Sequence, residues 1–165
     1  MSSRAHLLLA LAASGILAGA PACGGEPPLP PPAATDHPPL AAYDTGCSGT
    51  VPAPSNAGYE QQVVELTNQQ RRANGLPPLK LVGQLTNAAR WYAKDMVDDN
   101  YFGPDHDTYD RSGGSLVKVC TWSQRIGAFY TGWTSLSENI AAGYATPQAA
   151  VTGWMSSSGH RANVL

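Results

Sequence analysis

The stretch GQLTNAARWYAKDMVDDN, residues 83–100, carries the strongest folding signal in the chain. Its apolar side chains recur at spacings of three and four, with charged residues between them: Leu85, Ala88, Ala89, Tyr92 and Met96. That spacing places the apolar side chains on one face of a helix, which must be buried against another layer. We therefore predict an amphipathic helix here, and a hydrophobic core built against it.

Two further helices are predicted on either side of this one. Residues 59–74 have apolar residues on one side and end at Asn74-Gly75 before two prolines, as helices commonly do. A third helix opens at Thr146-Pro147, where a capping residue precedes a proline at the first helical position.

The segment between the second and third predicted helices has no helical periodicity. It contains the run SLVKVCTW, residues 115–122, and the aromatic run IGAFYTGW, residues 126–133. Valine, tyrosine and tryptophan favour strands, so one or two strands are predicted from this segment. Three helices with strand material between them indicate the α+β class, and 165 residues suffice for one domain.

The N-terminus has the composition of an export signal. Residues 1–22 hold one basic residue, Arg4, an apolar run from Leu7 to Leu17 and then small residues, which predicts a signal peptide. Ala20 and Ala22 allow ordinary cleavage, whereas Cys23 directly after them resembles a lipobox cysteine, with Ala20 where leucine is usual. Both routes export the chain, to the outer cell envelope as a lipoprotein or to the extracellular space.

Residues 23–58 are predicted to be a spacer that holds the domain, residues 59–165, away from a membrane. Nine of the fourteen prolines fall in this stretch, and repeated prolines favour an extended, semi-rigid chain. If Cys23 carries lipid, Cys47 and Cys120 remain as a pair able to form a disulfide in an oxidising compartment. The alternative is that Cys120 is a buried free thiol.

Charge argues against one class of partner. Ten basic and twelve acidic residues give a net charge of −2, and no basic patch is visible, so nucleic acid is not expected to bind.

Three residues outside the spacer are candidates for chemistry. His106 and His160 are the histidines within the predicted domain, and Glu138 is the lone acidic residue after Asp110. Burying a lone carboxylate is costly unless it is paired. Two imidazoles and a carboxylate suit zinc or another divalent cation, and they suit a metal-free hydrogen-bonded trio equally well. The structural alternatives are a solvated loop for His106 and capping roles for Glu138 and His160.

Four motifs, in this order, resemble the bacterial branch of the CAP superfamily, the SCP-like domain of cysteine-rich secretory, antigen five and pathogenesis-related proteins. They are ELTNQQRRANGLPPLKLVGQLTNAARWYAKDM, FGPDHD, LSENIAAG and AAVTGWMSSSGHRANVL. Asn68 and Arg71 match the N-x-x-R of the family's first helix. Leu79 and Leu85 match its recurrent leucines.

The resemblance implies an α-β-α sandwich with a central cleft that in some members holds a divalent ion. His106 matches the family's first cavity histidine, Glu138 and Asn139 match its E-N-[IL]-A motif, and Trp154 and His160 match W-x-x-S-x-G-H-R. The implied cleft residues are therefore His106, Glu138, Asn139 and His160, with His106, Glu138 and His160 as ligands for zinc or another divalent cation.

The chain departs from the family pattern after residue 165, because family members continue past the G-H-R motif with the final strands of the sheet. A sheet without those strands is expected to have an unpaired, aggregation-prone edge. A further hypothesis is that the chain does not fold. A cooperative transition in a thermal melt would argue against this hypothesis.

Two functions compete for a folded chain. The first is a binding module for an extracellular ligand, such as a lipid or a cell-envelope component, with membrane contact through Cys23 if that residue is lipidated. This reading follows from the resemblance and from the absence of a standard nucleophile motif. The alternative is a peptidase-like, metal-assisted hydrolase that uses Glu138 as general base.

Overall fold

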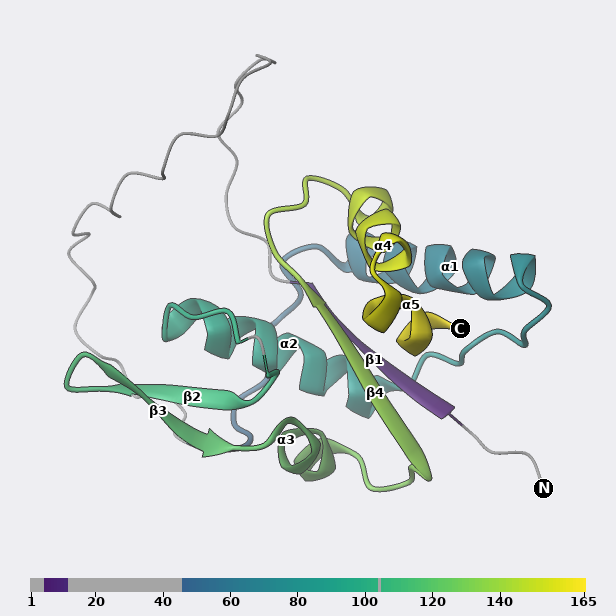
Figure 1. Cartoon of the computed structure of the whole chain (residues 1–165). Coiled ribbons are helices and arrows are strands. Elements are labelled where there is room, and N and C mark those ends of the chain that lie inside the picture. The colour runs from purple at the N-terminus through teal and green to yellow at the C-terminus, as the bar shows by residue number, and fades with distance from the viewer. Residues whose placement is uncertain (1–4, 12–45, 104) are drawn as a thin grey trace, which may run out of the picture.

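A computed structural model describes residues 5–11, 46–103 and 105–165 of the chain (Figure 1). In chain order the elements are β1 (Ala5–Leu11), α1 (Ala57–Ala73), α2 (Gly83–Asp98), β2 (Thr108–Ser112), β3 (Ser115–Cys120), α3 (Trp122–Phe129), β4 (Ser135–Ala141), α4 (Pro147–Ser156) and α5 (Ser158–Val164).

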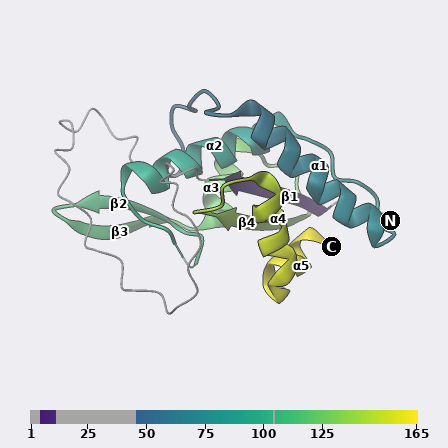
Figure 2. The ribbon, with the colours of Figure 1, turned by 90° about the horizontal axis from the view of Figure 1, so that it is seen from above.

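Helices lie on both sides of the sheet formed by β1 and β4. In Figure 1, α1, α4 and α5 lie above the two strands and α2 and α3 lie below them. The sheet is parallel, with register from Ala5 opposite Ser135 to Leu11 opposite Ala141. The antiparallel pair β2–β3 projects to one side, and Figure 2 shows it extending away from α4 and α5. The fold is therefore α+β with α-β-α layering, as the sequence predicts.

Strand β4 divides the core because successive side chains of a strand point to opposite faces. Ile140 packs into the cluster on the α2 and α3 side, and Ala141 packs into the cluster on the α1 and α4 side. The first cluster comprises Leu85, Ala88, Ala89, Trp91, Tyr92, Met96, Ile126 and Ile140. The second comprises Val63, Ala141, Ala150, Val151 and Trp154. The apolar face predicted for residues 83–100 is thus the face that builds the first core.

Two polar residues of α1 fix the chain that leaves this helix. The Asn68 side chain accepts from the Leu79 N–H at 2.7 Å and donates to the Leu79 carbonyl at 3.1 Å. Arg71, only 9% exposed, donates to the carbonyls of Pro77 at 2.9 Å and Val164 at 2.7 Å. The N-x-x-R pair therefore ties α1 to the α1–α2 connection and to the end of α5.

Strand material is found in the segment between the predicted helices, at β2 and β3, but the first part of the aromatic run at residues 126–133 is helical. Helix α3 covers Trp122–Phe129, and it begins at a capping box in which the Thr121 side chain accepts from the Gln124 N–H while the Gln124 side chain accepts from the Thr121 N–H. Burial of Arg125 and Ile126 holds the helix against α2. Eight residues are too few to show a clear helical periodicity in the sequence, so the aromatic composition of this segment dominates the prediction.

The C-terminal stretch also differs from expectation. The periodicity predicts no further helix after the one that opens at Thr146-Pro147, whereas the structure starts a new helix, α5, at Ser158. Ser157 ends α4 and begins α5 with an extended backbone, so the chain turns and α5 runs against β4. The described residues accordingly contain five helices where the periodicity predicts three.

Part of the predicted signal peptide lies in the sheet, since β1 is formed by Ala5–Leu11. The rest of residues 1–22, Cys23 and the spacer up to residue 45 lie outside the described residues, so export and lipidation stay predictions. Within the described residues, every helix is too short or too polar to cross a membrane.

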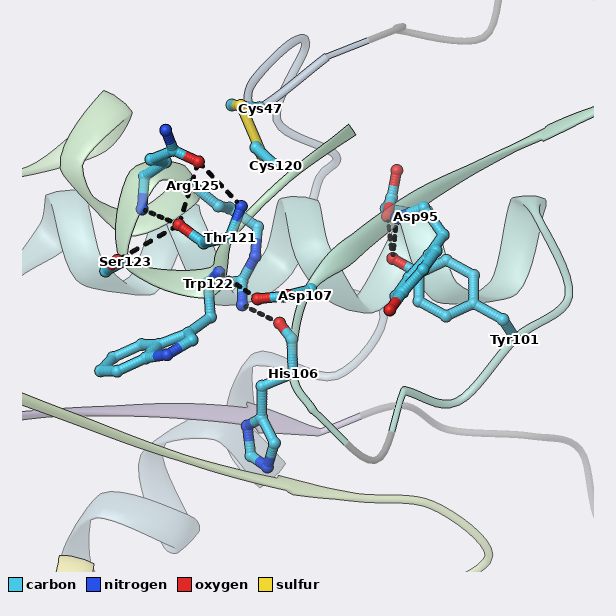
Figure 3. Close-up of a disulfide and its surroundings, with 12 residues drawn as sticks. Cys47, Asp95, Tyr101, His106, Asp107, Cys120, Thr121, Trp122, Ser123 and Arg125 are labelled. Atoms are coloured by element: carbon cyan, nitrogen blue, oxygen red, sulfur yellow. Dashed lines mark hydrogen bonds between the residues drawn. A yellow bond between two sulfur atoms is a disulfide. The ribbon is translucent and has the colours of Figure 1, made fainter. Parts of the chain in front are cut away.

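The structure joins Cys47 and Cys120 in a disulfide, with the Cα atoms 5.8 Å apart (Figure 3). Cys120 ends β3 and is 5% exposed, and Cys47 lies ten residues before α1. The bond therefore fastens the segment that leads into α1 to the end of the β2–β3 hairpin.

Reduction of this disulfide is expected to lower the free energy of unfolding by about 2–4 kcal/mol, because the intact disulfide closes a long loop and so restricts the unfolded chain. The two cysteines are 73 residues apart. Chemical denaturation of the oxidised protein and of the Cys47→Ser/Cys120→Ser double variant would measure the difference. Equal midpoints, with intact mass confirming the oxidised state, would contradict the expectation.

Candidate functional site

The centre of the candidate site is the carboxylate of Glu138 on β4, whose side chain is 1% exposed. Arg125 of α3 forms a bidentate salt bridge with it, in which Nη1 donates to Oε1 at 3.0 Å and Nη2 donates to Oε2 at 2.8 Å. His106 Nδ1 lies 3.0 Å from Glu138 Oε2. An ion-paired carboxylate can only accept, so the His106 Nδ1 N–H donates to Glu138.

The Arg125 guanidinium is held by further contacts. Its Nη2 also donates to the His106 carbonyl at 3.1 Å, a bond drawn in Figure 3. Its central carbon lies 3.5 Å from the centre of the Tyr92 ring, a cation–π contact. The side chain is fully buried. Arg125 is therefore a fixed cation, tied at once to the sheet, to α2 and to the loop that carries His106.

The loop at His106 is shaped by its neighbours. His106 has a positive φ of 64°, a conformation that is unusual for a residue with a side chain. The next residue, Asp107, accepts from the Trp122 N–H at the start of α3 (Figure 3). The Asp107 carbonyl accepts from the Tyr92 hydroxyl. These bonds hold the imidazole against Glu138 while 23% of the His106 side chain stays exposed.

The other two predicted cleft residues lie on the opposite side of β4. The Asn139 side chain donates to the His160 carbonyl at 3.0 Å and accepts from Asn163 Nδ2 at 2.9 Å, both in α5. His160 Nδ1 contacts Ser157 Oγ at 2.9 Å. Neighbouring residues in a strand face opposite ways, so Glu138 binds the α3 side while Asn139 binds the α5 side. The structure brings His106 to Glu138 and does not bring His160 to them.

The predicted metal ligands do not fit a divalent ion in this arrangement. The ligand atoms of His106, Glu138 and His160 do not come together as a set, and both oxygens of Glu138 already bind a guanidinium. Among the described residues, three potential ligand atoms lie mutually within 4.8 Å at Asp95, Asp99 and Asp110. The prediction of zinc at His106, Glu138 and His160 gains no support from the geometry and is tested below.

The carboxylates of Asp95, Asp99 and Asp110 repel one another at the junction of α2 and β2. Burial, together with the charges of Asp99 and Asp110, raises the pKa of Asp95 to about 7, although the Tyr101 hydroxyl that donates to it acts in the opposite direction. Burial raises the pKa of Asp110 as well. Asp95 therefore keeps its proton in the folded protein at pH values where the unfolded carboxyl, with a pKa of about 3.9, is ionised.

Stability is expected to fall as pH rises from about 4 to about 7, because the folded chain binds more protons than the unfolded chain in that window. Asp95→Asn should flatten this slope and be more stable than wild type at pH 8, since its amide oxygen can still accept from Tyr101. Urea denaturation at pH 4, 6 and 8 would measure this. Asp98→Asn, at a partly exposed pair with Lys94, is the control; equal slopes in both variants would contradict the assignment.

A groove of about 670 Å³ lies between α1 and α2. Its walls are mainly aliphatic, including Val64, Leu81 and Leu85, and none of His106, Glu138, Asn139 or His160 lines it. The candidate site is thus a partly exposed histidine beside a buried ion pair, separate from this groove.

Arg125 is the functional residue that the sequence does not single out. A lone carboxylate in a stretch of small and apolar residues requires a partner, and Lys118, Arg125 and Arg161 are the basic residues that follow Arg111. Arg125 lies between the runs 115–122 and 126–133, whose composition favours strands. Recognition of the capping box at Thr121 would have placed Arg125 on a buried helical face.

Comparison with known proteins identifies the family. The model of the cysteine-rich secretory protein (CAP) family matches residues 64–165, which is more than half of the chain. The chain belongs to the CAP family. Its core elements and the loop at His106 all lie inside the matched range, apart from β1 and the first turns of α1.

Two proteins of Bacillus subtilis (strain 168) show the extent of the similarity. The chain is 38% identical to the uncharacterized protein YkwD over 127 residues, which cover 77% of this chain and 45% of YkwD. It is 33% identical to the uncharacterized membrane protein YlbC over 106 residues, which cover 64% of this chain and 28% of YlbC. The chain thus spans less than half the length of these curated relatives. No solved structure matches it.

Proposed function

We propose that this CAP domain is an exported binding module and not a hydrolase. The observation that carries the proposal is the bidentate salt bridge between Arg125 and Glu138. A general base needs a carboxylate that is free to take a proton from water, and both Glu138 oxygens are already acceptors from a buried cation. His106 is then the polar group that the site offers to a ligand, since part of its side chain is exposed.

Export is proposed from the N-terminal sequence. An apolar run followed by small residues and Cys23 has the pattern of a secretory or lipoprotein signal. The disulfide between Cys47 and Cys120 supports an oxidising compartment. The ligand is accordingly a component of the cell envelope or of the extracellular medium, and membrane contact is through lipid on Cys23.

Activity against peptide and ester substrates tests the hydrolase alternative. Wild type and Glu138→Gln, a change that keeps the shape of the side chain, would be assayed with the same panel. We expect no turnover above background in either protein. Turnover by wild type that falls at least a hundredfold in Glu138→Gln would overturn the binding-module proposal.

Co-sedimentation tests the binding half. The full chain would be mixed with purified bacterial peptidoglycan and, separately, with phosphatidylglycerol vesicles. We expect saturable binding to one of the two, weakened at least tenfold in His106→Asn, because asparagine tolerates the positive φ and removes the imidazole. Lys80→Gln, at an exposed position of the α1–α2 connection, is the control. Equal binding by wild type and His106→Asn, or binding to neither probe, would contradict the role of this site.

A further inference from the structure

The negative charge of Glu138 is neutralised by a side chain of the protein itself. Glu138 and Arg125 have side chains that are 1% and 0% exposed, and they face each other at 2.8 and 3.0 Å. Among the described residues, the His106 imidazole also contacts this carboxylate, with Nδ1 3.0 Å from Oε2. The negative charge that would attract a divalent cation is therefore already neutralised.

The guanidinium cannot easily give way to a metal. Displacing it would break its bonds to both Glu138 oxygens and to the His106 carbonyl, and would remove it from the Tyr92 ring. A cation bound to Glu138 with Arg125 still in place would lie within a few ångströms of a like charge in a poorly solvated site, which is unfavourable. The third predicted ligand, His160, is bonded to Ser157 on the far side of β4.

We infer that Arg125 is the permanent counter-cation of Glu138, and that the site at His106 and Glu138 works without a divalent metal. With Nδ1 donating to Glu138, a neutral His106 imidazole presents Nε2 as a hydrogen-bond acceptor, and the matching group on a ligand is a donor such as a hydroxyl or an amide N–H. The ligand class rests on the proposed binding function. The exclusion of metal rests on the ion pair alone, and the two can fail separately.

Zinc titration of the full chain by calorimetry tests this inference without any organic ligand. Wild type and His106→Asn are expected to give the same weak heats, because any zinc bound by other histidines contributes equally to both proteins. Arg125→Met frees Glu138 and His106 and is expected to bind zinc at least tenfold more tightly than wild type. Arg90→Met, which removes the arginine paired with Glu60, should bind zinc as wild type does.

Two results would overturn the inference. One is a zinc site of submicromolar affinity in wild type that is lost in His106→Asn. The other is a folded Arg125→Met, shown by a cooperative thermal transition, whose zinc affinity equals that of wild type. If Arg125→Met does not fold, the comparison of wild type with His106→Asn decides alone. If the chain binds neither probe in co-sedimentation but the zinc titration gives the expected result, the proposed function is rejected. The inference that the site holds no divalent metal is then retained.

Discussion

Arg125→Met is expected to lower the free energy of unfolding by about 3–5 kcal/mol, because it leaves the buried Glu138 carboxylate without a counter-charge. Methionine keeps much of the side-chain volume, so the loss reports the charge more than a cavity. Urea denaturation at pH 7 would measure it. The matched control is Arg90→Met, at a partly exposed pair with Glu60, which is expected to cost about 0–1 kcal/mol.

A double variant separates the ion pair from general damage to α3. Arg125→Met combined with Glu138→Leu removes both charges, and replacing a buried pair by apolar residues is often close to neutral. The double variant is therefore expected to be more stable than Arg125→Met alone. A double variant that is the least stable of the set would show that the loss comes from packing and not from the unpaired carboxylate.

Trp154→Ala is expected to cost a similar amount, about 3–5 kcal/mol, because it empties the centre of the second core. Trp154 is 2% exposed, packs with Val63 and Val151, and donates its indole N–H to the Ile140 carbonyl at 2.9 Å. Thermal and urea denaturation would both report the change. Trp133→Ala removes a tryptophan that is 38% exposed and should change stability by less than half as much.

Trp154→Phe distinguishes packing from the hydrogen bond. Phenylalanine fills most of the space but leaves the Ile140 carbonyl, on β4, without its donor, so a loss of about 1–3 kcal/mol is expected. If Trp154→Ala and Trp133→Ala lower the free energy of unfolding by the same amount, α4 does not pack on β4 as the structure shows.

The parts of the fold that were predictable from sequence are those with a long, regular pattern. The apolar spacing of residues 83–100 covers four turns and coincides with α2. The Thr146-Pro147 start of α4 depends on local chemistry, and the Thr146 side chain does accept from the Ala149 N–H. Helix α3 is eight residues long and is held by contacts with α2, so its tertiary packing outweighed the strand preference of its composition.

The site was predictable only in part, because its geometry depends on distant segments. Glu138 was recognisable as a lone carboxylate that needs a partner, and His106 does lie beside it. The partner with the strongest contact, Arg125, is 13 residues away in a helix that the sequence pattern does not reveal. The family resemblance places His160 with the cleft residues, whereas the alternation of side chains along β4 places it with Asn139 on the other face.

The role of Arg125 as the permanent counter-cation of Glu138 is tested most directly by X-ray diffraction from crystals of the full chain grown with millimolar zinc, with data collected at the zinc absorption edge. We predict no anomalous peak within bonding distance of Glu138, and Arg125 bound to both carboxylate oxygens. A strong peak shared by Glu138 and His106, with the Arg125 side chain turned away, would contradict this prediction.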